Sequence, residues 1–175
     1  MFQKYKLKDI IYAPYDKNAP EVVREATGLI SKAIKGYKIY HFGSTAIPNM
    51  SGKNIINLFI SCPMNDFEST LQQLDRLGLT NHPYRIEPPN RPLKVASLQF
   101  EDKVYGIHVH LLESGSQNEK NALFFRDYLI THPEVVSEYA ELKEKVVKEN
   151  SGDSEFYRQA KNAFIKSILQ LNNNQ

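Results

Sequence analysis

The sequence predicts an α+β fold in which a small mixed β-sheet packs with helices and a three-helix segment follows. Residues 55–60 are apolar except for Asn57, and apolar residues also predominate in 37–42, which is typical of strands. Residues 94–112 read as a β-hairpin, and from 118 onward apolar residues recur at helical spacing. Segregation of strands and helices along the chain favours α+β architecture.

Length and composition predict one domain over residues 1–175. The formal net charge of +2 argues against an extended nucleic-acid partner. The single cysteine, Cys62, excludes an internal disulfide and is expected to be a buried, inert thiol. No apolar run approaches the ~20 residues of a membrane span. We therefore expect a cytoplasmic protein without a membrane partner, and leave its oligomeric state open.

A first helix is expected to start near Pro20 and to end at Gly36. Asn18 and Glu21 have the spacing of a capping box, in which each side chain bonds the other residue's backbone N–H. Glycine after the last turn is a common helix stop. A short strand over 9–13 is expected to precede this helix.

A second helix is expected after Asn65, with Glu68 completing a capping box and Gly78 as its stop. Residues 80–92 follow and contain four prolines, so they cannot continue a helix. Loops of this length inside a compact domain are often functional or mobile.

The hairpin places side chains alternately on its two faces. Ile107, Val109 and Leu111 share one face, and His108 and His110 share the other. Helices are then expected over 118–130, after a Thr131–Glu134 capping box, and after the break at 151–153, each with its own apolar stripe.

Residues 41–60 carry the first candidate site. Gly43, Ser44 and Thr45 follow a strand directly, and a glycine–hydroxyl turn at a strand end can expose donors to a phosphate. Lys53 can add a point charge at the same place. The alternative is a tight turn that holds no ligand.

The alternating histidines are a second candidate. Two imidazoles on one face suit Zn²⁺ or another transition metal, and His41 is a candidate third ligand. The alternative, which we favour, is that His108 and His110 line a pocket by hydrogen bonding.

Four stretches together resemble the GrpB family. They are HFGSTAIPNMSGKNIINLFI (41–60), HVH (108–110), FFRDYLITHPEVVSEYAELK (124–143) and YRQAKNAFI (157–165), and the resemblance extends over about 12–168. It implies a nucleotidyltransferase-like fold, a Gly-Ser turn that holds nucleotide phosphates, and strand carboxylates that bind Mg²⁺. Family members occur alone or fused to dephospho-coenzyme A kinase, for which a folding-assistance role has been proposed.

The sequence departs from the family at Asn57, where an aspartate is usual in the strand after the loop. An amide lacks the charge that attracts Mg²⁺ or another divalent metal. Glu113 is the nearest acidic residue to the histidine strand, so the metal candidates are His108, His110 and Glu113.

The expected pocket lining comes from both halves of the chain. It consists of His41, Asn57, His108, His110, Arg126, Tyr157 and Lys161. For Arg126 an ion pair with Asp127 that fixes its helix is an equal alternative, and for Tyr157 and Lys161 an exposed helix edge.

Three function classes follow from these residues. The chain binds a nucleotide or another small phosphate-containing molecule and transfers a nucleotidyl group to a small acceptor, or binds such a ligand without catalysis, or serves as a protein-interaction module.

Overall fold

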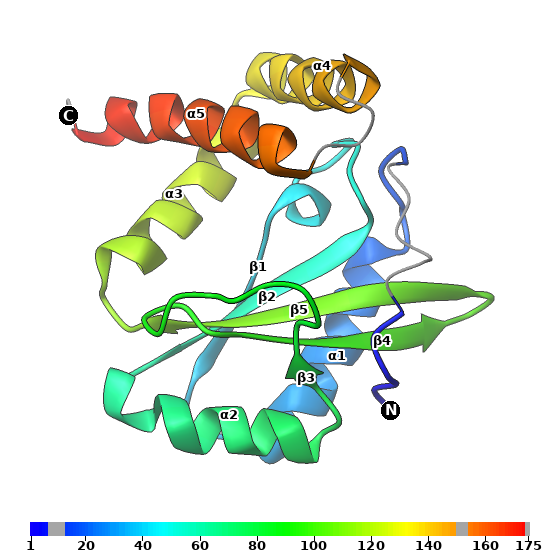
Figure 1. Ribbon diagram of the computed structural model, residues 1–175, viewed down its shortest axis with the longest axis vertical. Helices are drawn as coiled ribbons and strands as arrows, with labels where there is room; N and C mark the ends of the chain where they lie inside the picture. The colour runs from blue at the N-terminus through cyan, green and yellow to red at the C-terminus, as the bar shows by residue number, and fades with distance from the viewer. Residues whose placement is uncertain (7–12, 150–153, 174–175) are drawn as a thin grey trace. The chain divides into compact units, whose positions relative to one another are not determined.

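A five-stranded mixed sheet organises the first of the two compact units into which the chain divides, Met1–Glu119 and Lys120–Gln175 (Figure 1). The computed structural model describes residues 1–6, 13–149 and 154–173. The predicted strand at 9–13 therefore lies outside the described residues except for Ala13. The elements of the first unit are α1 (Ala19–Ala33), β1 (Lys38–Phe42), the 3₁₀ turn η2 (Ser44–Ala46), β2 (Ile55–Cys62), the 3₁₀ turn η3 (Met64–Asp66), α2 (Phe67–Arg76), β3 (Thr80–Asn81), β4 (Leu93–Phe100) and β5 (Lys103–Glu113).

The strand order is β1-β2-β5-β4-β3, and the central pair β2 and β5 is parallel. All other pairs are antiparallel, including the predicted hairpin of β4 and β5. Parallel neighbours need a long crossover, which here contains η3, α2, β3 and β4. The α+β prediction is confirmed.

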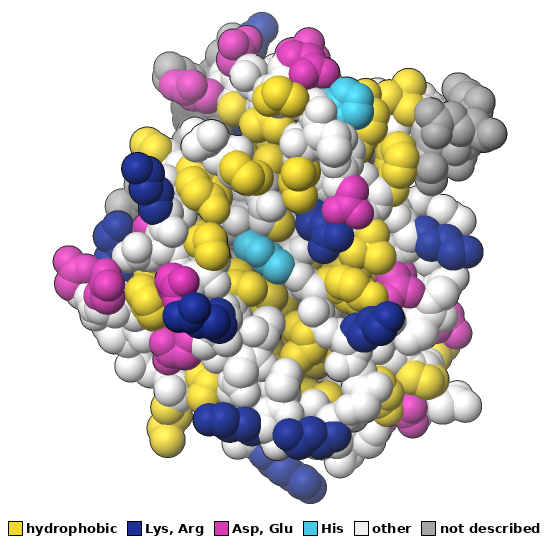
Figure 2. All heavy atoms as spheres, turned by 180° about the vertical axis from the view of Figure 1, so that it is seen from behind, with side chains coloured by type: hydrophobic (Ala, Val, Ile, Leu, Met, Phe, Trp, Pro, Cys, Tyr) yellow, Lys and Arg dark blue, Asp and Glu magenta, His cyan; other side chains and the backbone are white. Residues whose placement is uncertain are grey.

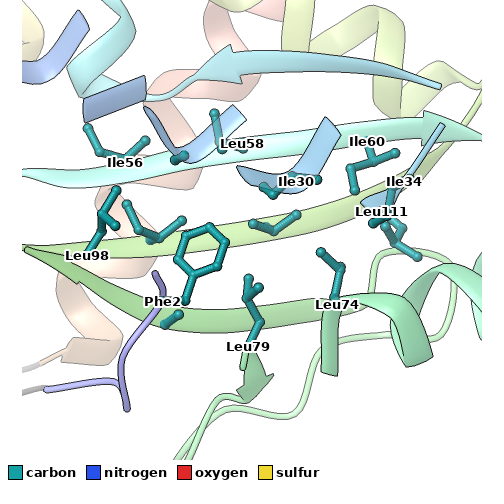
Figure 3. Close-up of a cluster of buried hydrophobic side chains, with 14 of the residues drawn as sticks. Phe2, Ile30, Ile34, Ile56, Leu58, Ile60, Leu74, Leu79, Leu98 and Leu111 are labelled. Carbon is teal, nitrogen blue, oxygen red and sulfur yellow. The ribbon is translucent and has the colours of Figure 1, made fainter. Parts of the chain in front are cut away.

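One side of the sheet, here called the helix face, packs against α1 and α2 (Figure 3). Each buried aliphatic side chain there contributes roughly 1.5–3 kcal/mol by leaving water. Its strand residues alternate along β2 and β5, as period-2 patterning requires; they are Ile56, Leu58, Ile60, Ile107, Val109 and Leu111. The opposite side, the histidine face, carries the intervening residues Asn57, Phe59, His108 and His110.

Both predicted helices of the first unit form, but their capping boxes do not. The Asn18 side chain makes no cap bond to α1 and donates instead to Glu101 Oε2 at 3.0 Å. The second helix starts later than predicted, because η3 intervenes and Asp66 rather than Asn65 precedes α2. Gly78, with φ +92°, ends α2 as expected, because a left-handed residue there favours glycine.

Asp16 fixes the tip of the β4–β5 hairpin to the start of α1. Its Oδ2 accepts hydrogen bonds from the Tyr105 hydroxyl at 2.9 Å and from Lys103 Nζ at 3.0 Å. Its Oδ1 accepts a hydrogen bond from the backbone N–H of Asn18 at 3.0 Å. Burial opposes ionisation, but these three donors lower the pKa of Asp16 below its ordinary value.

The outer edge of β4 is covered by two short segments from distant parts of the unit. The two-residue strand β3 pairs with Lys94 and Val95. Further along, Gln3 and Ser97 exchange two backbone hydrogen bonds of 2.8 and 2.9 Å. The extreme N-terminal residues are therefore part of the sheet.

The second unit consists of α3 (Gln117–Thr131, whose first turn belongs to the first unit), α4 (Pro133–Glu149) and α5 (Ser154–Asn173). Tyr139 of α4 stacks on Phe164 of α5 with ring centroids 4.4 Å apart. Thr131 does not cap α4, because its hydroxyl donates back to the carbonyls of Asp127 and Tyr128. Among the described residues, none of the helices combines the length and apolar character needed to cross a membrane.

Candidate functional site

The turn after β1 depends on Gly43. Its φ of +77° and ψ of −171° lie in a region that is essentially restricted to glycine. A Cβ at this position would also lie 3.0 Å from Asn57 Nδ2, closer than nearly all real contacts. Gly43 therefore lets the chain reverse directly over the start of β2, and Ser44–Ala46 then form one 3₁₀ turn.

Ser44 and Lys53 are brought together by Gly52. A Cβ on Gly52 would collide with the Ser44 hydroxyl and would lie 3.0 Å from Ser44 Cβ, so the backbone passes directly against this side chain. Gly52 is held by two backbone hydrogen bonds to Ala13, of 2.7 and 2.9 Å. Lys53 follows Gly52 in the chain, so the backbone of Lys53 lies next to the turn.

Asn57 lies beneath the turn on the histidine face. Its side chain is half-buried, and its Nδ2 donates to the Ile55 carbonyl at 3.0 Å. The amide is therefore oriented by its own strand, with the nitrogen turned toward a carbonyl. A carboxylate in the same place would have no proton to donate.

Thr45 does not face a ligand space as predicted. It is 4% exposed, its hydroxyl donates to the Ile55 carbonyl at 3.2 Å, and His41 Nε2 lies 2.9 Å from the same oxygen. This hydroxyl is committed to fixing the turn onto β2. Thr45 is thus a structural residue of the turn, and of the predicted phosphate contacts Gly43, Ser44 and Lys53 remain.

His41 is on the opposite side of the sheet from the other two predicted metal ligands. It pairs directly with Leu58, and directly paired residues point to the same face. Leu58 belongs to the core beneath α1, whereas His108 and His110 are on the histidine face. The prediction of His41 as a third ligand is wrong. Side chains alternate between the two faces of a strand, and the register of β1 places His41 on the helix face.

His108 and His110 are both buried, at 4% and 5% exposure, and their role in lining a pocket stays a prediction. His108 Nε2 lies 2.8 Å from the Tyr5 hydroxyl, and His82 lies against both rings, with centroids 5.6 Å from Tyr5 and 5.8 Å from His108. Burial raises the pKa of Tyr5 to about 12, so it holds its proton.

The segment between β3 and β4 adds charge to this face. In Figure 1 it runs across the sheet on the side away from α1. Arg85 forms an ion pair with Glu87, and its charge is close enough to lower the pKa values of Lys53 and His82, in each case after the larger effect of burial. Burial lowers the pKa of Arg91, Glu87 opposes this effect, and Arg85 adds a smaller lowering.

The predicted metal set does not assemble. Glu113 pairs with Cys62, a residue of the core cluster, so its Cβ projects toward the helix face and away from the two histidines. Within the described parts of the chain, no three His, Cys, Asp or Glu side chains are grouped as metal ligands. Mg²⁺ prefers several oxygen ligands with negative charge. Ser44 and the Asn57 amide do not fit such a site.

The remaining predicted residues belong to the second unit. Arg126 Nε donates to its neighbour Asp127 at 2.7 Å, and Tyr157 lies in α5. Lys161 is half-buried, and its charge contributes to lowering the pKa of Lys143 to about 8, after the larger effect of burial. Their grouping with the turn stays a prediction.

A surface depression lies elsewhere in the first unit, along the outer side of α1 from Glu21 to Lys32 and against Phe100. Seen from behind in Figure 2, charged side chains of both signs are scattered among apolar ones.

The buried Cys62 is also remote from the turn, and burial raises its pKa to about 11, as an inert thiol requires.

Sequence reasoning missed the residues that surround the histidines. Tyr5 and His82 approach His108 from 103 and 26 positions away in the sequence. The signal in the sequence is the basic and aromatic content of the proline-rich segment 80–92.

Comparison with known proteins gives a consistent family. The model of the family described as GrpB protein matches residues 9–171, which span both units. The UPF0157 protein YqkA of Bacillus subtilis is 32% identical over 133 residues, which cover 74% of this chain but only 36% of that protein. This chain thus spans about a third of that relative.

Solved structures agree on the fold. The crystal structure of conserved protein GrpB from Enterococcus faecalis is similar with a TM-score of 0.72 at 24% identity, and covers 90% of this chain and 94% of that one. The Cid1 poly(U) polymerase with MgGTP bound is similar with a TM-score of 0.51 at 10% identity, over 83% of this chain and 46% of that one. These likenesses establish a nucleotidyltransferase-like fold.

Proposed function

This chain belongs to the GrpB family, and from that premise we propose that it binds a nucleotide or another small phosphate-containing ligand at the Gly43–Ser44 turn. The observation that carries the proposal is the close approach of Gly52 to the Ser44 hydroxyl. Because Lys53 is the next residue, its backbone lies beside the turn. A hydroxyl donor and an ammonium group at one strand end are suited to phosphate oxygens.

Binding without catalysis is the form of this function that the residues favour. The resemblance to the family implies that Asn57 stands where an aspartate is usual, and the Asn57 amide donates to the Ile55 carbonyl. Nucleotidyl transfer of the usual kind depends on carboxylates that hold divalent metal. The likeness to the Cid1 polymerase fold makes nucleotidyl transfer the second candidate.

The test is calorimetric titration of the full chain with a panel of nucleoside mono-, di- and triphosphates. Ser44→Ala should weaken binding about tenfold, because a hydrogen bond to a charged group is lost. Ser61→Ala is the matched control, since Ser61 lies at the other end of β2 and bonds to Ser114 at 2.9 Å. Equal affinities of the two variants would refute the turn as the binding site.

The same samples separate the two candidates. Pyrophosphate is released only when an acceptor takes the nucleotidyl group, so the samples with Mg²⁺ or Mn²⁺ also contain a mixture of small hydroxyl and amine acceptors. Saturable binding of a nucleoside triphosphate with no release of pyrophosphate under these conditions supports a binding protein. Pyrophosphate release that falls in Ser44→Ala supports transfer.

A further inference from the structure

We propose that Arg85 and Arg91, on the segment joining β3 to β4, form a second anion anchor opposite the Gly43–Ser44 turn, so that the ligand carries at least two adjacent phosphates. The inference rests on the proposed function and assigns residues and a charge requirement to the same site. Neither arginine was identified from the sequence.

The position of the segment brings these arginines to the site. His82, at the start of the segment, lies against Tyr5 and His108 on the histidine face. His108 is paired in register with Asn57, which lies against Gly43. A continuous set of contacts therefore leads from the turn across two strands to the segment.

Arg91 is held with part of its guanidinium inside the protein. Its backbone amide donates to the Pro88 carbonyl at 2.9 Å, which closes a turn, and the residue is only partly exposed. Its Nε is buried and has no hydrogen-bond partner among the described residues. A buried donor without a partner is costly, and a phosphate oxygen would satisfy it.

The charges of this region favour a ligand with more than one negative group. The charged side chains that interact here include the cations Lys53, Arg85 and Arg91 and the carboxylate of Glu87, which pairs with Arg85. The effect of Arg85 on the pKa values of Lys53 and Arg91 indicates mutual repulsion among the cations. Bound anions would relieve this repulsion, and a guanidinium can hold two phosphate oxygens at once.

The test uses inorganic probes, so that no base contributes to binding. Phosphate, pyrophosphate and tripolyphosphate are titrated into the full chain by calorimetry at two salt concentrations. Affinity should rise about tenfold or more from phosphate to pyrophosphate and should weaken with salt, as expected for charge recognition.

The variants assign the effect to the segment. Arg85→Gln should reduce tripolyphosphate affinity about tenfold. Arg24→Gln is the matched control, because Arg24 is also exposed and also pairs with a glutamate, Glu21, but lies on α1. Arg91→Lys keeps the charge of a partly buried residue and should lose less affinity than Arg91→Gln.

Two results would overturn the inference: equal affinity for phosphate and pyrophosphate, or equal affinity of Arg85→Gln and Arg24→Gln for tripolyphosphate. Failure of the proposed function gives a different pattern, in which Ser44→Ala and Ser61→Ala bind nucleotides equally. Nucleotide binding that depends on Ser44 but not on Arg85 would retain the turn and reject the second anchor.

Discussion

Replacing Asn57 by aspartate tests how the floor of the candidate site is built. The change keeps the size of the side chain but replaces Nδ2, which donates to the Ile55 carbonyl at 3.0 Å, by an oxygen. Two acceptors would then face each other in a half-buried place. The lost hydrogen bond costs about 1 kcal/mol and the repulsion and desolvation of the charge about 1–2 more.

We therefore expect Asn57→Asp to lower the free energy of unfolding by about 2–3 kcal/mol at pH 7. With a urea m-value of roughly 1–3 kcal/mol/M, the midpoint should fall by about 0.7–3 M. Asn65→Asp is the control, because Asn65 is exposed in η3 and the charge change is the same.

The pH dependence gives an independent check. Protonation of the new carboxyl supplies a hydroxyl that can donate to the Ile55 carbonyl, so its pKa in the folded state is raised above about 3.9. The folded state then binds more protons than the unfolded state, and stability is lost as pH rises through the folded pKa. The deficit should be small below pH 4 and fully present at pH 7. Equal urea midpoints for Asn57→Asp and Asn65→Asp at pH 7 would refute the reasoning.

Three further variants test other contacts. Gly52→Ala should destabilise the protein by about 1–3 kcal/mol and weaken phosphate binding, because the added methyl group displaces Ser44. Gly28→Ala is the control, since there is open space around a Cβ at that position and no destabilisation is expected. Equal melting temperatures of the two variants would contradict this prediction. Asp16→Asn should lower the free energy of unfolding by about 1–3 kcal/mol at pH 7. The lowered folded pKa of Asp16 gives stability above about pH 4, which is lost as pH falls through that pKa. A difference from the parent chain that stays constant between about pH 2 and 7 in urea titrations would count against the three hydrogen bonds. Lys143→Met should stabilise the chain at pH 7 by about 1–3 kcal/mol, because burial lowers the folded pKa of Lys143 to about 8. Burying the charged form therefore costs stability at pH 7, and this cost is relieved only as pH rises from about 8 to about 10.5. An unchanged thermal midpoint at pH 7 would exclude that cost.

Local patterns predicted the elements of the fold well. The apolar stripe of α1, the stop at Gly78 and the hairpin of β4 and β5 are all present, because each depends on neighbours within one turn or one strand pair. Only the capping box of Asn18 failed for a tertiary reason. The Asn18 side chain donates to Glu101, 83 residues away, which no helix-end rule can anticipate.

The site was harder to predict because it depends on which face each strand presents. The parity of β5 alone separates Glu113 from His108, so this error could have been avoided from the sequence. The face of His41 could not be read that way, since it depends on the register of β1 against Leu58. The contacts of Tyr5 are longer in range still and required the fold.

The covering of the β4 edge by Gln3 and by β3 has a consequence for how the protein resists self-association. An open strand edge is a template for pairing with another copy of the chain. Here Gln3 pairs with Ser97, and Thr80–Asn81 pair with Val95 and Lys94, so each segment covers part of the β4 edge. Two residues form too short a strand to hold by themselves. Protection of this edge therefore depends on the first few residues of the chain, and a fusion or tag that pulls them away would leave a hydrophobic strand available for intermolecular pairing.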